Sequence, residues 1–166
     1  MMIKRVQIAL VLLFVALVSV MAWHGLRERE PAYEGKPLSS WLEAYRLHGV
    51  AGVETWQVRE EQQKADEIVR KAGTNAIPTL LRMLRARDSA LKVELMAWAR
   101  RQHFIQVKYT PAEELNYRAC WAFGVLRGKA QSAVPALIEI ANQNNSHESQ
   151  YYATAALVFI GPPAAR

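Results

Sequence analysis

Two stretches of the chain carry the same pattern of apolar positions. These positions stand at i, i+3, i+4 and i+7, as Ile77, Leu80, Leu81 and Leu84 in the first stretch and as Val134, Leu137, Ile138 and Ala141 in the second. A proline follows the first apolar residue in both, at Pro78 and Pro135. The first turn of a helix tolerates proline, because the amide it lacks would have no intrahelical partner there. The pattern predicts two equivalent amphipathic helices.

Other helical stripes end in glycine and predict the partners of these helices. The stripe before Gly128 is Ala119, Ala122, Phe123 and Leu126, and 33 residues later Tyr152, Ala155, Ala156 and Phe159 precede Gly161. Thr110, Pro111 and Glu113 suit the start of the first of these helices. A helix from about Thr55 is expected to end at Gly73, with Trp56, Ala65, Ile68, Val69 and Ala72 turned inward.

A shorter helix is expected near Pro37. Ser40 and Glu43 fit a capping box, and the inward stripe would be Leu38, Trp41, Leu42 and Tyr45. Residues 27–36 are charged and broken by proline and glycine, which predicts an exposed linker.

The chain also repeats a phrase. Residues 72–81 reappear as residues 127–138, and a third copy begins at Ile160 and is cut off at Arg166. Self-similarity over a few tens of residues indicates stacked supersecondary units. The spacing is uneven, since Gly73 and Gly128 are 55 residues apart. We expect the surplus, about residues 88–110, to hold a helix capped by Asp88 and then a loop.

These residues resemble HEAT repeats, the helical hairpins of armadillo-like solenoids. The resemblance lies in the Ala-Leu-x-x-Ile-Gly type phrase, here residues 155–164, and in the Val-Pro-x-Leu phrase within residues 128–137. Residues 33–42 are also similar to the lead-in of bacterial HEAT-repeat proteins that carry an export or anchor segment. The resemblance implies an all-α, right-handed superhelix over residues 37–166 with a partner-binding surface. No polar terminal cap follows, so we expect the sequence to be a fragment.

Residues 1–26 differ from the rest in hydropathy. Lys4 and Arg5 precede an apolar run from Val6 to Leu26, which as a helix would be about 31 Å long and would span a bilayer core of roughly 30 Å. A cleaved signal peptide is the alternative, because a small-residue site ends at Ala22. Both interpretations send the body out of the cytoplasm, either tethered by one span or secreted.

Composition adds little chemistry. The net charge is +6, with Arg82, Arg85, Arg87, Lys92, Arg100 and Arg101 gathered in one stretch. The sequence shows no phosphate loop, no paired-cysteine metal spacing and no close pair among its four histidines, so we expect neither catalysis nor a cofactor. The single cysteine, Cys120, is expected to be a packed thiol.

We therefore expect a non-catalytic scaffold that binds a protein or peptide partner. The first candidates for contact with an acidic partner are Arg82, Arg85, Arg100 and Arg101, with Trp98 as an aromatic anchor. Two alternatives stay open. HEAT-like bilin lyases would make the protein an enzyme, and basic HEAT proteins bind nucleic acid, although export argues against both.

Overall fold

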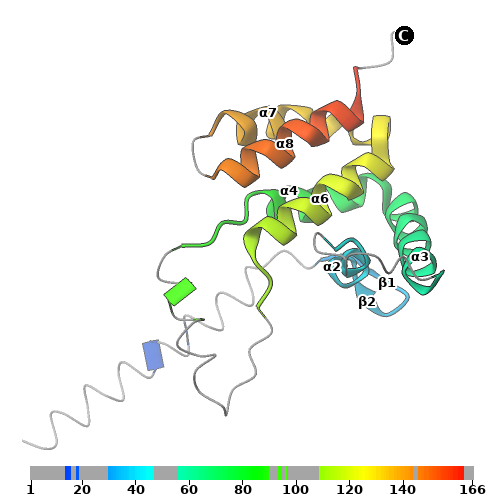
Figure 1. Cartoon of the computed structure of the whole chain (residues 1–166), viewed down its shortest axis with the longest axis horizontal. Helices are drawn as coiled ribbons and strands as arrows, with labels where there is room; N and C mark the ends of the chain where they lie inside the picture. Colours follow the sequence, from blue (N-terminus) through cyan, green and yellow to red (C-terminus); the bar gives the residue numbers. More distant parts are fainter. Residues whose placement is uncertain are drawn as a thin grey trace, which may run out of the picture. The chain divides into compact units, whose positions relative to one another are not determined.

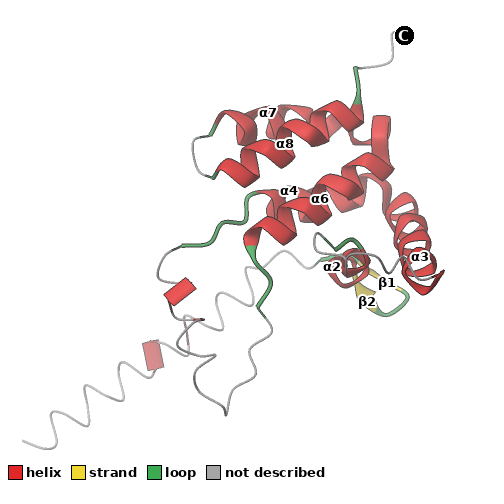
Figure 2. Ribbon diagram, in the orientation of Figure 1, coloured by secondary structure: helices red, strands yellow, loops and turns green. Residues whose placement is uncertain are grey.

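The structure is a computed structural model. It describes residues 30–46, 56–89, 109–143 and 146–162, together with Phe14, Val15, Val18, Val93, Glu94 and Met96. The chain divides into two compact units, Met1–Glu30 and Pro31–Arg166. The described part of the second unit is mostly helical, as the sequence predicts (Figure 2).

The second unit opens with a small hairpin. Strands β1 (Ala32–Tyr33) and β2 (Lys36–Pro37) pair antiparallel across a tight turn. The two turn residues, Glu34 and Gly35, have φ of 50° and 77°, as a two-residue hairpin turn of this kind requires. The expectation of a linker through residue 36 is thus wrong from Ala32 onward. Turn residues mark a hairpin as readily as a linker, and the strands are too short to show alternation.

A short helical segment follows the hairpin and buries the predicted stripe. α2 (Leu38–Trp41) continues into the 3-10 turn η1 (Leu42–Ala44). Leu38, Leu42 and Tyr45 are buried, and the Trp41 indole donates to the Tyr33 carbonyl at 3.0 Å. Ser40 lies inside α2, so the expected capping box is wrong; Pro37 occupies the N-cap position.

The described residues of this unit form five longer helices and two connectors. In chain order they are α3 (Trp56–Ala72), η2 (Gly73–Ala76), α4 (Ile77–Leu84), α6 (Ala112–Leu126), η3 (Arg127–Ala133), α7 (Val134–Asn142) and α8 (His147–Ile160). α4 packs on α6, and α7 packs on α8. α6 and α8 lie side by side in front of α4 and α7, and α3 packs against α6 (Figure 1). The α3, α6 and α8 helices therefore form one continuous surface.

The inward faces follow the predicted pattern closely in the first copy and less so in the second. In α4, Ile77, Leu80 and Leu84 are buried and Leu81 is half-buried. In α7, Leu137 is buried, but Ile138 is 46% exposed and Ile140 is buried instead. The expectation of an inward Ile138 is therefore wrong. The buried positions Leu137 and Ile140 correspond to the buried Leu80 and Met83 of α4, whereas Ile138 is more exposed than its counterpart Leu81.

Three helices end in equivalent turns. Each has buried residues at i, i+3 and i+7, followed by a residue with positive φ. The buried sets are Ala65, Ile68 and Ala72 in α3, Ala119, Ala122 and Leu126 in α6, and Ala153, Ala156 and Ile160 in α8. The turn residues are Gly73 (φ 55°), Arg127 (φ 48°) and Gly161 (φ 75°). The structural equivalent of Gly73 is thus Arg127, not Gly128.

The same comparison corrects the predicted face of α8. The register expected from the sequence places Phe159 inward, but Phe159 is 46% exposed and Ile160 is buried. Trp56 is also outside the core, since it is the first residue of α3 and is 71% exposed.

Buried polar side chains join the helices at the end of α4. Asn116 of α6 donates from Nδ2 to the main-chain carbonyls of Met83 (2.8 Å), Leu84 (3.0 Å) and Ala86 (3.4 Å). Ser149 of α8 also donates to the Leu84 carbonyl. The last carbonyls of a helix have no intrahelical partner, so these side chains close α4 and tie it to α6 and α8.

Asp88 caps the start of α6, and the helix that the sequence predicts directly after Asp88 lies mostly outside the described residues. Its Oδ2 accepts from the Ala112 amide at 2.8 Å, at the start of α6. Pro111, rather than Thr110, occupies the N-cap position there. Nearly all of the predicted membrane segment 1–26, and most of the insertion 88–110, lie outside the described residues. Among the described residues, no helix is both long and apolar enough to cross a membrane.

Candidate functional site: an aromatic groove on α3, α6 and α8

The predicted arginine patch is only partly described. Arg82 is exposed on α4. Arg85 follows α4, is about half exposed, and forms an ion pair with Glu139 of α7 at 3.7 Å. Trp98, Arg100 and Arg101 lie outside the described residues, so the patch stays a prediction.

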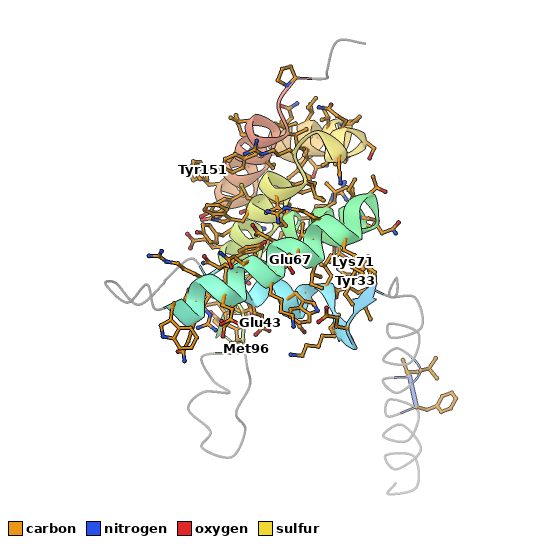
Figure 3. The ribbon with its side chains drawn as sticks, turned by 90° about the vertical axis from the view of Figure 1, so that its right-hand side faces the viewer. Tyr33, Glu43, Glu67, Lys71, Met96 and Tyr151 are labelled. Carbon is orange, nitrogen blue, oxygen red and sulfur yellow. The ribbon has the colours of Figure 1, made fainter. Side chains whose placement is uncertain are left out.

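A row of aromatic rings crosses the surface formed by α3, α6 and α8. Trp121 of α6 is its centre: its ring centroid lies 6.5 Å from Tyr45, 6.2 Å from Tyr117 and 6.4 Å from Phe159. Tyr117 meets Tyr152 edge-on at 5.9 Å, and Tyr152 meets Tyr151 at 5.1 Å. Rings at these separations attract one another, so the row holds its shape. Figure 3 shows its last member, Tyr151, standing out from α8 at one edge of the molecule.

Two hollows flank Trp121 along this row. The first, of about 480 Å³, lies towards α3 and is lined by Tyr45, Arg59, Gln62, Gln63, Asp66, Tyr117, Trp121 and Val125. The second, of about 780 Å³, lies towards α8 and is lined by Asp66, Arg70, Trp121, Gly124, Val125, Arg127, Val158, Phe159 and Ile160. Because the two hollows share Asp66, Trp121 and Val125, they form one depression with the Trp121 ring between its halves. We call this depression, with the six rings of the row, the aromatic groove.

Trp121 remains accessible within the groove. It is 45% exposed, Phe159 is 46% exposed, and Val158 beside it is 74% exposed. A Cβ built at Gly124 would lie in ordinary van der Waals contact with the Phe159 ring, at 3.4 Å, so α8 packs closely on α6 at this point. Clustered apolar surface of this kind, rimmed by polar residues, marks interaction sites on soluble domains.

The polar groups of the groove are mostly engaged with one another. The Tyr45 hydroxyl donates to Asp66 Oδ1 at 2.5 Å, and Arg70 donates to Asp66 Oδ2 at 3.1 Å. Burial, and then the hydrogen bond with Asp66, raise the pKa of Tyr45 well above its usual value of 10.0. Tyr45 thus stays a neutral phenol at physiological pH and holds the carboxylate in place.

Arg127 differs from these paired groups in its charge and in its backbone conformation. No ion pair or hydrogen bond involves its side chain within the described part of the chain. Its φ of 48° with ψ of −132° is a conformation that costs a non-glycine residue about 1–3 kcal/mol. A cation at a helix C-terminus recovers about 0.3–1 kcal/mol from the helix dipole. The dipole therefore offsets only part of the strain.

The remaining chemistry of the described residues is sparse. Cys120 is 4% exposed, and burial raises the pKa of its thiol to about 12. A thiol that is both buried and protonated is a poor nucleophile. No group of three His, Cys, Asp or Glu side chains could hold a metal ion within the ranges that the structure describes.

The sequence pattern pointed to other residues than those that form the groove. Tyr117 and Trp121 lie on α6, and Tyr152 lies on α8. Aromatic residues at helical spacing are as typical of a packed core as of a binding surface, so the sequence does not show that these rings are exposed. The usable signal was their i, i+4 spacing on α6, which places Tyr117 and Trp121 on one face. No protein-family model, curated protein or solved structure matches the chain.

Proposed function

We propose that the unit Pro31–Arg166 is a non-catalytic scaffold of HEAT-like helical hairpins that binds an extended peptide segment of a partner protein in the aromatic groove. The pairing of α4 with α6 and of α7 with α8, and the equivalent turns at Gly73, Arg127 and Gly161, support the repeat assignment. Residues 1–26 then tether the unit to a membrane or direct its export, so that it meets its partner outside the cytoplasm.

The single observation that carries the proposal is the half-exposed Trp121 between two adjoining hollows. Tryptophan and tyrosine dominate the binding energy of protein interfaces, and the strongest contacts lie near the centre of the buried patch. Trp121 has that central position, with Tyr45, Tyr117 and Phe159 around it. An elongated groove lined by rings suits an extended or polyproline-type segment, which costs little conformational entropy to bind.

Charge complementarity narrows the partner. The larger hollow is lined by Arg70 and Arg127 against the single carboxylate of Asp66. A segment that combines apolar or aromatic residues with acidic ones fits this lining. Opposite charge also speeds association and selects against basic partners.

The test is selection of a random dodecapeptide phage library on the purified full chain. Enriched clones are then measured on wild type, Trp121→Ala and Ile138→Ala. Ile138 is a matched control, because its exposure of 46% is close to the 45% of Trp121 and no residue of α7 lines either hollow.

We expect Trp121→Ala to weaken binding at least tenfold, as loss of a central aromatic anchor does, and Ile138→Ala to leave it unchanged. Circular dichroism checks that both variants keep their helix content. The proposal fails if no clone is enriched, or if enriched clones bind Trp121→Ala as well as wild type. Carbonate extraction of cell membranes, with and without residues 1–26, tests the tether separately.

A further inference from the structure

The turn at the end of α6 has a residue that its backbone does not favour. The equivalent turns after α3 and α8 use Gly73 and Gly161, whose positive φ costs glycine nothing. At Arg127 the same φ forces a side chain into a conformation that L residues rarely adopt. The next residue, Gly128, is a glycine, but its φ is not positive. The arginine at this turn thus has to be explained by what its side chain does.

Arg127 is one of the residues that line the larger hollow of the aromatic groove. The other charged residues there, Asp66 and Arg70, already neutralise each other at 3.1 Å. Within the described residues Arg127 has no such partner, and it is exposed. The hollow therefore presents one uncompensated cation beside the rings of Trp121 and Phe159.

We infer that Arg127 is a specificity residue that binds an acidic side chain of the partner segment, next to an aromatic or apolar residue that contacts Trp121 and Phe159. This inference rests on the proposed peptide-binding function and adds the chemistry of its partner. A guanidinium binds a carboxylate through two parallel hydrogen bonds, which fixes direction as well as charge.

The carboxylate comes from within the bound segment rather than from its end. The two hollows continue on both sides of Trp121 and share its lining, so an extended segment passes along the groove instead of stopping in it. An Asp or Glu side chain reaches Arg127 from such a path, with neighbouring residues in the first hollow.

The experiment runs the phage selection in parallel on full-length wild type, Arg127→Gly and Lys129→Ala. Lys129 is a charge-matched control, because it is exposed in the same connector but lines neither hollow. In this library each peptide is fused to the coat protein at its C-terminus and has no free carboxyl end. A second library, displayed with free C-termini, tests the other source of a carboxylate.

We expect Asp and Glu to be enriched at least twofold among peptides selected on wild type and on Lys129→Ala. Among peptides selected on Arg127→Gly, Asp and Glu should return to their library frequency, while binding of these peptides still requires Trp121. Acidic enrichment that persists in Arg127→Gly, or enrichment found only with free C-termini, overturns the inference while leaving the proposed function intact. A wild-type pool with no enriched peptides refutes the proposed function itself.

Thermal unfolding of the same variants supplies a readout that a merely structural role would not give. Because Arg127→Gly restores the residue found at the two equivalent turns, its melting temperature should be unchanged or raised by up to about 3 °C. A fall of several degrees would mean that the arginine is there for stability, and would overturn the inference.

Discussion

The junction at Asn116 gives the sharpest prediction about stability. Its amide is fully buried and donates at 2.8 Å, 3.0 Å and 3.4 Å to three carbonyls at the end of α4. Each well-formed hydrogen bond contributes about 0.5–1.5 kcal/mol, and a buried carbonyl left without a donor costs about 1–3 kcal/mol. When the Asn116 amide is removed, the Ser149 hydroxyl still donates a hydrogen bond to the Leu84 carbonyl. Asn116→Ala should therefore lower the free energy of unfolding by about 2–4 kcal/mol.

Asn116→Asp should differ from Asn116→Ala in its dependence on pH. The substitution places an oxygen where Nδ2 donates, so a charged carboxylate would face three carbonyl oxygens without solvent. The folded-state pKa of the introduced group must rise above its unfolded value of about 3.9, because only the protonated form can donate. Its stability is therefore greatest below that value and is lost as pH rises, at about 1.4 kcal/mol per pH unit until the raised pKa is reached.

The assay is urea unfolding of wild type and both variants, followed by circular dichroism between pH 4 and pH 7. Asn116→Ala is the matched control, since it removes the same donor but introduces no titrating group. The difference between Asn116→Asp and wild type should widen with pH, and the difference for Asn116→Ala should stay constant. Parallel curves for the two variants, or a loss below about 0.5 kcal/mol in Asn116→Ala, would refute the assigned hydrogen bonds.

Three further predictions test other parts of the structure. Gly73→Ala should destabilise the protein by about 1 kcal/mol, because a φ of 55° strains alanine even though the added Cβ would meet nothing within 4 Å. Gly128→Ala is the control: its site is equally open but has no positive φ, so it should cause no such loss. Equal losses of stability in the two variants would contradict the turn at Gly73. The burial and raised pKa of Cys120 should keep its labelling by a disulfide reagent slow in native protein at pH 7, with fast labelling after unfolding in urea. Fast native labelling would contradict its burial. Replacing Arg82, Arg85, Arg100 and Arg101 together by Gln should weaken capture of an acidic partner without lowering helix content, and unchanged capture in a pull-down would show the patch to be only a solvated surface.

Much of the helical framework could be predicted from periodicity and turn residues. The starts of α4 and α7 followed from Pro78 and Pro135, and the end of α3 followed from Gly73. Periodicity predicts which face of a helix is apolar. Which residues at the edges of that face are buried depends on the helices that pack against it. On α7, Ile138 is 46% exposed and Ile140 is buried, although Leu81, the counterpart of Ile138 on α4, is half-buried.

The groove was harder to predict, because its residues carry no motif. Aligning glycine with glycine matches Gly73 to Gly128, whereas the backbone angles show that the structural equivalent of Gly73 is Arg127. Asn116 did leave a trace in the sequence. It is a polar residue on the same face as Ala119 and Phe123, and a polar residue on a buried stripe requires hydrogen-bond partners. Which carbonyls it would meet depends on how α4 packs on α6.

The most direct test of the binding groove is a nuclear magnetic resonance titration of the ¹⁵N-labelled full chain with an acidic peptide from the wild-type pool. Each tryptophan gives one indole N–H signal, and the Trp121→Phe variant assigns the one that matters. The signal of Trp121 should shift with increasing peptide. Those of Trp41, whose indole is bonded to Tyr33, and of Trp56, at the start of α3, should stay in place. A shift of Trp41 or Trp56 with Trp121 unmoved would contradict the groove as the binding site.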